Sequence, residues 1–165
     1  MSALIRYLTN SPCSHVAIRF SGEESNWMVE AASKGVYPGW WHYFNKKNTI
    51  IDRFEIVGID EVLLEKVVDE ALDEMVGEKY DILGLIGFAI AIAVKAVTGK
   101  VIKNIFGSKK MMFCSEFILR VSNKIKKELG IQIFEGDPEL TSPGEEWEQA
   151  KNNQYLKRLY DKNSA

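Results

Sequence analysis

A cysteine, a histidine and a glutamate are distributed along this chain in a way that could support acyl-transfer chemistry. Cys114 opens a helical pattern, whereas His15 and Glu30 lie in two strand-like runs about a hundred residues earlier. In such a set the thiol attacks a carbonyl carbon, the imidazole takes the thiol proton, and the carboxylate fixes the tautomer of the imidazole. These residue types therefore predict a nucleophile, a base and an orienting group.

The predicted position of Cys114 at a helix N-terminus favours its reactive form. Free backbone N–H groups and the helix macrodipole stabilise negative charge there, and hence a thiolate. The backbone N–H of Cys114, with one further donor, could also hold the oxyanion of a tetrahedral intermediate. Tyr80, in Lys79-Tyr80-Asp81, is our candidate for that donor.

Each of these residues also has an ordinary structural explanation. A lone cysteine is usually buried as a small apolar residue, and a lone histidine on a strand is usually a structural residue. Glu30 ends an apolar run and could simply face water, while Tyr80 could pack with its hydroxyl bonded to the backbone. It is their occurrence as an ordered set that favours a site.

A predicted β-hairpin would bring His15 and Glu30 together. The two strand-like runs that contain them are separated by a polar loop at 21–24. If Phe20 pairs with Ser25, His15 lies directly opposite Glu30, with Cβ atoms about 5 Å apart. A slip of one residue in this register would break the contact.

Apolar periodicity and turn residues predict the remaining elements. Helices are expected over 4–8, 60–76, 114–129 and from Ser142, a strand over 48–57, and a turn and connector over 35–41. The helices over 60–76 and 114–129 each have one apolar face, and Cys114 begins the apolar face of the second. The charged residues of 60–76 are expected to be solvated.

The stretch 82–106 allows two interpretations. Residues 82–94 contain no charged side chain, but thirteen residues fall short of the about 20 that a membrane-spanning helix needs. The first interpretation is a buried helix. The second is a segment that dips into a bilayer surface with nearby lysines at the headgroups, namely Lys95, Lys100, Lys103, Lys109 and Lys110.

The composition limits the class of protein. A chain of 165 residues with 46% hydrophobic and 27% charged residues is typical of one globular domain. A net charge of −2 gives no electrostatic support for nucleic-acid binding. Two Cys and two His lack zinc-site spacing, so we expect no metal or other cofactor. Without a secretory signal pattern at the N-terminus we expect a cytoplasmic location, where a Cys13–Cys114 disulfide is disfavoured.

Five short motifs in chain order carry a resemblance to a known family. They are Asn10-Ser11-Pro12-Cys13-Ser14-His15-Val16-Ala17-Ile18, Val29-Glu30-Ala31 followed by Gly35-Val36, Lys79-Tyr80-Asp81, Phe113-Cys114-Ser115-Glu116 and Thr141-Ser142-Pro143. Together, over residues 4–145, they resemble the permuted papain-like amidases, which belong with the NlpC-type cysteine peptidases and are looser relatives of the lecithin:retinol acyltransferases. In the permuted branch the histidine strand precedes the cysteine helix, as here.

The resemblance implies an α+β fold over 1–165, in which a small antiparallel sheet or open barrel packs against the nucleophile helix. It implies Cys114 as nucleophile, His15 as base and Glu30 as third member, and it aligns Tyr80 with a family tyrosine near the nucleophile. The chain departs from the family in lacking the long strand and Gly-Asp turn that many members carry before the histidine. It also has a long stretch at 84–110, which is interpreted as a lid, a membrane contact or extra core.

The leading functional interpretation is a cysteine hydrolase, an amidase or peptidase that forms a thioester acyl-enzyme on Cys114 and releases it to water. The resemblance implies a peptide-like substrate such as a cell-wall-type peptide, since peptidoglycan peptides are the family's usual substrates, and a cytoplasmic peptide, an isopeptide or a lipid amide stays open. A lipid-acting acyltransferase or thioesterase of the same fold is the alternative, because it differs only in what resolves the acyl-enzyme.

Two further interpretations lie outside catalysis. In a non-catalytic binding module, Trp40 and Trp41 would line a substrate groove with His42 and Tyr43, although a packed connector explains these aromatic residues equally well. In a membrane-surface protein, the stretch 82–106 would make a peripheral contact with lipid. The sequence leaves the oligomeric state open.

Overall fold

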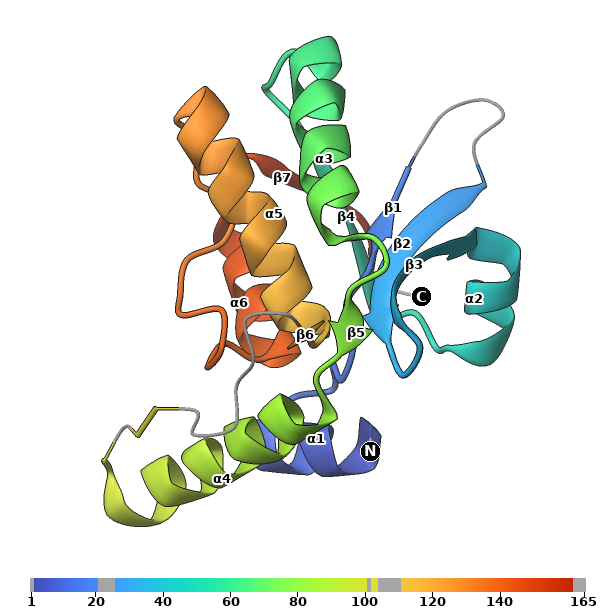
Figure 1. Cartoon of the computed structure of the whole chain (residues 1–165). Helices are drawn as coiled ribbons and strands as arrows, with labels where there is room; N and C mark the ends of the chain where they lie inside the picture. The colour runs from blue at the N-terminus through green and yellow to red at the C-terminus, as the bar shows by residue number, and fades with distance from the viewer. Residues whose placement is uncertain (1, 21–25, 101, 104–110, 162–165) are drawn as a thin grey trace.

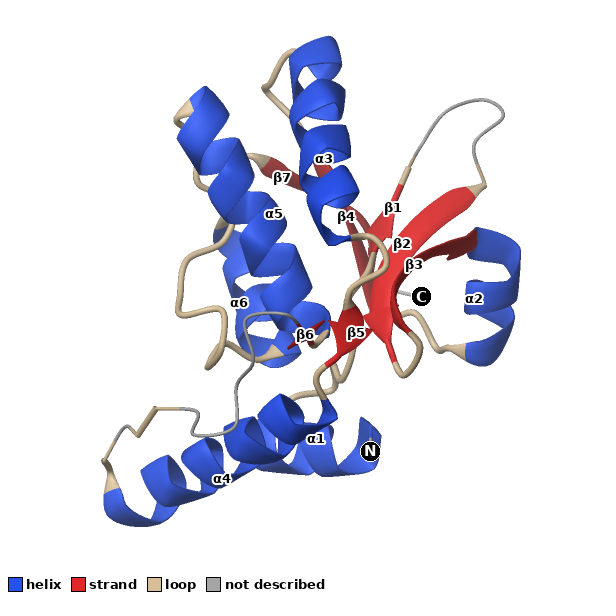
Figure 2. Ribbon diagram, in the orientation of Figure 1, coloured by secondary structure: helices blue, strands red, loops and turns tan. Residues whose placement is uncertain are grey.

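The computed structural model describes residues 2–20, 26–100, 102–103 and 111–161, and it has a mixed α+β architecture (Figure 1). The helices are α1 (Ser2–Thr9), α2 (Trp41–Lys47), α3 (Glu61–Met75), α4 (Ile82–Thr98), α5 (Cys114–Leu129) and α6 (Pro143–Asn152). The strands are β1 (Ile18–Arg19), β2 (Trp27–Ala32), β3 (Gly35–Trp40), β4 (Asp52–Ile56), β5 (Lys79–Tyr80), β6 (Met111–Met112) and β7 (Leu156–Asp161). The described strands form small sheets and no closed barrel (Figure 2).

The first sheet, β1-β2-β3, is antiparallel, and the register between β1 and β2 differs from the predicted one. Ile18 pairs with Val29, and the Phe20 N–H donates to the Trp27 carbonyl at 3.2 Å, so Phe20 is level with Trp27 rather than with Ser25. The predicted direct pairing of His15 with Glu30 is therefore wrong by two positions. His15 itself lies before β1, in a segment that forms no strand, so its contact with Glu30 does not come from strand pairing.

The segment predicted as a connector at 35–41 is instead β3 followed by the start of α2. Gly35, Pro38 and Gly39 obscured the strand, because glycine and proline are typical of turns. Gly35 has φ +111° and lies so close to the Glu78 carbonyl that a Cβ would be 2.3 Å from its oxygen. This approach lets the Val36 N–H donate to that carbonyl at 2.9 Å, which joins β3 to the chain before β5.

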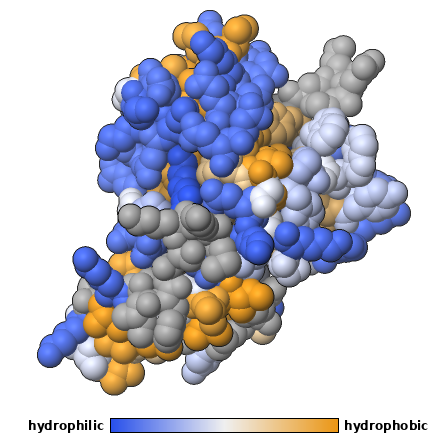
Figure 3. Space-filling model, in the orientation of Figure 1, coloured by the Kyte–Doolittle hydropathy of each residue, from blue (hydrophilic) through white to orange (hydrophobic). Residues whose placement is uncertain are grey.

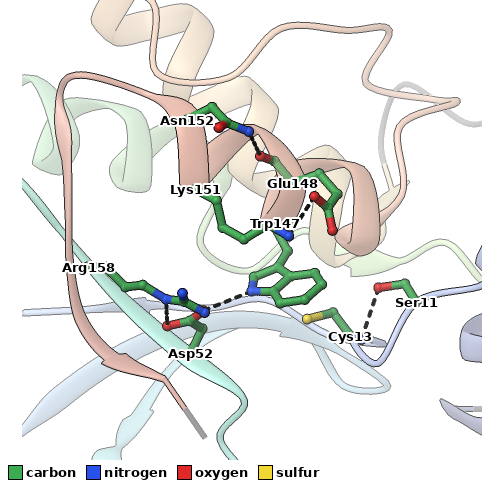
Figure 4. A network of polar contacts seen from close by, with 8 residues as sticks. All are labelled: Ser11, Cys13, Asp52, Trp147, Glu148, Lys151, Asn152 and Arg158. Atoms are coloured by element: carbon green, nitrogen blue, oxygen red, sulfur yellow. Dashed lines mark hydrogen bonds and ion pairs between the residues drawn. The ribbon is translucent and has the colours of Figure 1, made fainter. Parts of the chain in front are cut away.

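The second sheet pairs β4 with β7 near the C-terminus. The strand predicted over 48–57 is confirmed as the shorter β4, but the sequence analysis missed its partner β7. Asp52 on β4 ties the two strands to α6, accepting from Trp147 Nε1 at 3.0 Å and from Arg158 Nε at 2.8 and 2.9 Å (Figure 4). This buried carboxylate explains why the C-terminal strand docks where it does.

The predicted helices over 4–8, 60–76 and 114–129, and the one beginning at Ser142, are all confirmed. The Asp60 side chain caps α3, Gly130 ends α5 in the left-handed conformation, and a capping box formed by Ser142 and Glu145 begins α6. Val62 and Leu63 lie in the helix predicted to have an apolar face but are 74% and 52% exposed, and in this first part of α3 it is Leu64 that packs against the core.

The main core lies between α3, α5 and one face of the first sheet. Its buried members are Val29, Ala31, Val36, Val67, Val68, Ala71, Leu72, Met75, Met112, Phe117, Ile118, Val121, Ile125 and Ile133. Burial of such side chains is the dominant favourable term in folding. A small antiparallel sheet thus packs against the helix that begins at Cys114.

A second, smaller core joins α4 to the rest of the molecule. Phe88 on α4 is buried with Ile5 of α1 and with Phe113, the residue before Cys114. The helix expected in 82–106 is confirmed. It is buried on one side only, since Ile82 and Leu83 are about half exposed at 49% and 58%. Lys109 and Lys110 lie outside the described residues. No helix of the described chain is long and apolar enough to cross a membrane.

Candidate active site

Cys114 is the first residue of α5 and is only 3% exposed. Phe113 occupies the N-cap position, and because its side chain has no oxygen or nitrogen it makes no capping hydrogen bond. The N–H groups of a helix's first turn have no partner within the helix, and here the side chain before them supplies none. The sulfur therefore lies beside backbone donors that favour negative charge.

His15 lies between Cys114 and Glu30. Its Nε2 is 2.6 Å from Glu30 Oε2, and the imidazole also hydrogen-bonds to the Cys114 thiol, which leaves Nδ1 as the nitrogen for the sulfur. Burial alone lowers the pKa of His15, but the hydrogen bonds and the charges of Cys114 and Glu30 together outweigh it and raise the pKa to about 10. The imidazole therefore carries a proton at neutral pH when it is held between the two groups.

Glu30 is held from two sides. Tyr37 on β3 lies directly opposite Glu30 in the sheet, and its hydroxyl donates to Glu30 Oε1 at 3.0 Å. Burial opposes ionisation of Glu30, but the hydrogen bond to His15 and the charge of His15 lower its pKa. Tyr37 was missed by the sequence analysis, because the segment that contains it was read as a connector. Recognising 35–40 as a strand would have placed Tyr37 opposite Glu30.

Aromatic side chains from α2 cover one side of His15. The ring centroid of Phe44 is 6.0 Å from that of His15, Trp41 stacks on Phe44 at 5.6 Å, and the Arg19 guanidinium lies 4.8 Å above the Trp41 ring. Trp41 is therefore one ring away from the triad. Since side chains alternate along a strand, Trp40 lies on the sheet face opposite to Tyr37, where it contacts Trp27 at 5.1 Å.

Tyr80 lies near Cys114 because of a short parallel pair of strands. Tyr80 on β5 pairs with Met112 on β6, two residues before Cys114. Burial, together with the charges of Cys114 and Asp81, raises the pKa of Tyr80, so its hydroxyl keeps its proton. The ring also packs against the second core beside Phe113. A role for Tyr80 as the second oxyanion donor stays a prediction.

Buried carboxyl groups lie around the start of α5. Glu146 on α6 is 1% exposed, and neither of its oxygens has a hydrogen-bond partner among the described residues. Burial and the negative charges of Cys114 and Glu145 raise its pKa well above the usual value. Burial also raises the pKa of Glu116 to about 7, despite its 2.6 Å ion pair with Arg120.

The buried position of Glu146 could not be predicted from the sequence, because a glutamate in the first turn of a helix normally faces water. Here α6 is drawn against α5 by a hydrogen bond from the Ser115 hydroxyl to the Thr141 carbonyl at 2.7 Å. This contact joins the Cys-Ser-Glu motif to the Thr-Ser-Pro motif. A protonated Glu146 adds no negative charge beside the sulfur.

Cys13 lies in different surroundings from Cys114, and both are free thiols. Residues 13–17 are not part of a strand, so strand alternation does not place Cys13 on the same side as His15. Its backbone N–H donates to Ser11 Oγ at 3.1 Å, beside the Asp52 network (Figure 4). Burial raises the pKa of the Cys13 thiol to about 11, so Cys13 is a poor nucleophile.

Other features give no second candidate site. In the described parts of the chain, no group of three or more His, Cys, Asp or Glu side chains is arranged to hold a metal ion. A hollow between the end of α1 and α6, lined in part by Ser11, Gly144 and Trp147, contains none of the triad residues. Comparisons with family models, with curated proteins and with solved structures found no match to this chain.

Proposed function

We propose that this protein is a cysteine hydrolase that cleaves an amide bond through a thioester on Cys114. The observation that supports this most strongly is the position of His15, which bonds the thiol on one side and Glu30 on the other, with Nε2 2.6 Å from Oε2. A base between a nucleophile and an orienting carboxylate is the arrangement that nucleophilic acyl transfer requires. The order of these residues, with histidine first and cysteine last, supports a permuted papain-like fold.

In the proposed reaction the thiolate of Cys114 attacks the amide carbonyl carbon while His15 holds the proton. The carbonyl oxygen becomes an oxyanion, which the backbone N–H of Cys114 stabilises together with a second donor, proposed as Tyr80. The tetrahedral intermediate collapses when His15 gives its proton to the departing amine, and a thioester remains. His15 then takes a proton from water, the resulting hydroxide attacks the thioester, and a carboxylic acid and the thiol are released.

Glu30 acts in this scheme as a positioning residue for the imidazole. Its carboxylate stabilises the imidazolium and keeps Nδ1 directed to the sulfur, and Tyr37 in turn fixes the carboxylate. The proposed substrate is a peptide-like amide, with Trp41 and Phe44 forming an apolar wall beside His15. A lipid-acting acyltransferase or thioesterase is the second candidate, because the exposed apolar face of α4 offers a surface for a lipid substrate.

The first test measures the reactivity of the two thiols with iodoacetamide between pH 5 and 10, with each cysteine followed by peptide mass spectrometry. We expect Cys114 to react at pH 6 at least about 100-fold faster than in His15→Ala, since a general base contributes at least that factor. Cys13 is an internal control, because its pKa of about 11 keeps it unreactive in both proteins. Equal rates for Cys114 with and without His15 would contradict an activated pair.

The second test looks for the acyl-enzyme itself. Incubation with p-nitrophenyl octanoate, followed by acid quenching and intact-mass measurement, should show one octanoyl group on Cys114 and its slow loss to water. Cys114→Ser and Cys114→Ala should carry no thioester, whereas Cys13→Ser should behave as the wild type. A reactive Cys114 that never becomes acylated would instead favour a non-catalytic binding module.

A further inference from the structure

Helix α4 presents a continuous apolar stripe to solvent. The exposed side chains are Ile82 (49%), Leu83 (58%), Ile86 (46%), Ile90 (39%) and Val97 (85%). At 100° per residue they all project within a sector about 100° wide that runs the length of the helix. Figure 3 shows this apolar surface in orange over the lower part of the molecule.

The opposite side of α4 is already occupied. Phe88 and Ala91 are buried at 2% and 5%, and Phe88 packs with Ile5 of α1 and with Phe113. A different side of α4 therefore packs against the rest of the protein, and the exposed stripe is a separate face of the helix. Single exposed aliphatic residues are common, but here five of them lie along one side of one helix.

The charge around the stripe indicates the kind of partner. Residues 82–115 contain five lysines and no acidic residue, whereas the rest of the chain contains 16 basic and 23 acidic residues. Lys95, Lys100 and Lys103 are exposed at the C-terminal end of α4 and just after it. An apolar surface with a local positive charge in an otherwise acidic protein is complementary to an apolar partner with a negative surface.

The dimensions of the stripe favour a bilayer over a second protein chain. A helix of 17 residues is about 25 Å long, so a stripe about 10 Å wide offers about 250 Å². A specific protein interface usually needs about 800 Å² from each partner. A bilayer surface needs no shape complementarity, and a helix that lies in it buries its apolar face by about 5–10 Å.

We propose that α4 docks this protein on the surface of an anionic lipid bilayer. The helix lies in the plane of the interface, with its aliphatic stripe among the acyl chains and its lysines among the acidic headgroups. This inference depends on α4 and its charge alone. It holds whether or not Cys114 performs the chemistry proposed above.

The test is sedimentation of the full chain with vesicles, either pure phosphatidylcholine or a 70:30 mixture of phosphatidylcholine and phosphatidylglycerol. We expect binding to the anionic vesicles at 150 mM NaCl to be at least tenfold tighter than to the neutral ones, and to weaken at 500 mM NaCl. The Ile86→Asp/Ile90→Asp variant should lose at least tenfold in affinity. Lys100→Glu/Lys103→Glu, which changes the two exposed lysines just after α4, should lose the preference for anionic vesicles.

The matched control is Val62→Asp/Leu63→Asp, which changes two exposed apolar side chains on α3 instead. It should bind as the wild type, and the thermal midpoints of all variants should agree because the changed residues are exposed. No binding by the wild type, or equal loss in both aspartate variants, would overturn the proposal. A dimer in sedimentation velocity that Ile86→Asp/Ile90→Asp dissolves, without vesicle binding, would overturn it in favour of self-association.

Discussion

Tyr37 on β3 supports the proposed triad by a hydrogen bond to Glu30 on the neighbouring strand β2. It is level with Glu30 in the register of β2 and β3, and its hydroxyl bonds the carboxylate oxygen that does not contact His15. Glu30 is thereby held at both oxygens. A carboxylate held in this way keeps the imidazole in one orientation without the entropy loss of ordering a mobile side chain.

Replacing Tyr37 by Phe should slow alkylation of Cys114 about fivefold at pH 7, since one net hydrogen bond contributes about 1 kcal/mol. The low-pH limb of the rate profile should also move to higher pH, because Glu30 loses a bond that lowers its pKa. Tyr43→Phe is the control, as Tyr43 on α2 is 61% exposed. If Tyr37→Phe slows alkylation of Cys114 without moving the pH profile, then Tyr37 contributes only packing and does not act through Glu30.

The buried Glu146 should make the protein less stable as the pH rises. Its pKa is higher in the folded state than the usual 4.5, so the folded state binds more protons than the unfolded state above pH 4.5. The free energy of unfolding therefore falls from pH 4.5 upward, by up to about 1.4 kcal/mol per pH unit, until Glu146 ionises.

Glu146→Gln removes this titration and keeps the size of the side chain. Urea unfolding should show nearly equal stability for variant and wild type at pH 4.5, and greater stability for the variant at pH 8 by at least about 1 kcal/mol. Glu65→Gln, at an exposed position of α3, should show no such divergence. Parallel curves for Glu146→Gln and wild type would mean that Glu146 is ionised in the folded protein.

For individual residues, the sequence indicates which side chains belong to the candidate site better than it indicates what each of them contacts. His15 and Glu30 were expected to meet and do so at 2.6 Å, although they are not directly paired. The contact does not depend on the predicted register, because His15 lies in the irregular segment before β1 and not in a strand. Glu146 could not be predicted, because its burial depends on how closely α6 packs against α5.

Among the elements, β3 depends most on a single backbone position. Gly35 enters the strand at φ +111° and passes within contact distance of the Glu78 carbonyl. Only glycine combines that dihedral angle with that approach at no steric penalty. The strand that carries Tyr37 is therefore anchored at its first residue.

Comparison with Gly77 separates the effect of the positive φ at Gly35 from the effect of its close approach to the Glu78 carbonyl. It also has a positive φ, +92°, but an added Cβ would meet nothing within 4 Å. Gly77→Ala should lower the free energy of unfolding by about 1–2 kcal/mol through backbone strain alone. Gly35→Ala should lower it by clearly more in urea unfolding, since its Cβ meets a backbone oxygen at 2.3 Å. Equal losses would mean that the Glu78 carbonyl moves away freely.

Helices were easier to predict here than strands, for a physical reason. The periodicity of α3 and α5 extends over 15 and 16 residues, and side chains or glycine at their ends mark the boundaries. The strands β1, β5 and β6 have two residues each, too short for any pattern. β7 is exposed over much of its length and alternates weakly, so only its pairing with β4 identifies it.

The whole molecule divides its charge and its apolar surface unevenly. The acidic helix α3 covers the main core on one side, while α4 carries exposed aliphatic side chains and is followed by lysines. The sequence could not indicate which side of α4 is buried, because a helix that is apolar on all sides has no polar face to mark the solvent side. That choice is made by α1, which supplies Ile5 as the partner of Phe88.

The second core also determines how the proposed nucleophile is attached to the rest of the protein. Phe113 lies with its ring 5.4 Å from that of Phe88, and one peptide bond separates it from Cys114. Phe113 thus belongs both to the packing of α1 and α4 and to the chain immediately before the first turn of α5. The seam between α1 and α4 therefore ends one residue from the sulfur of Cys114.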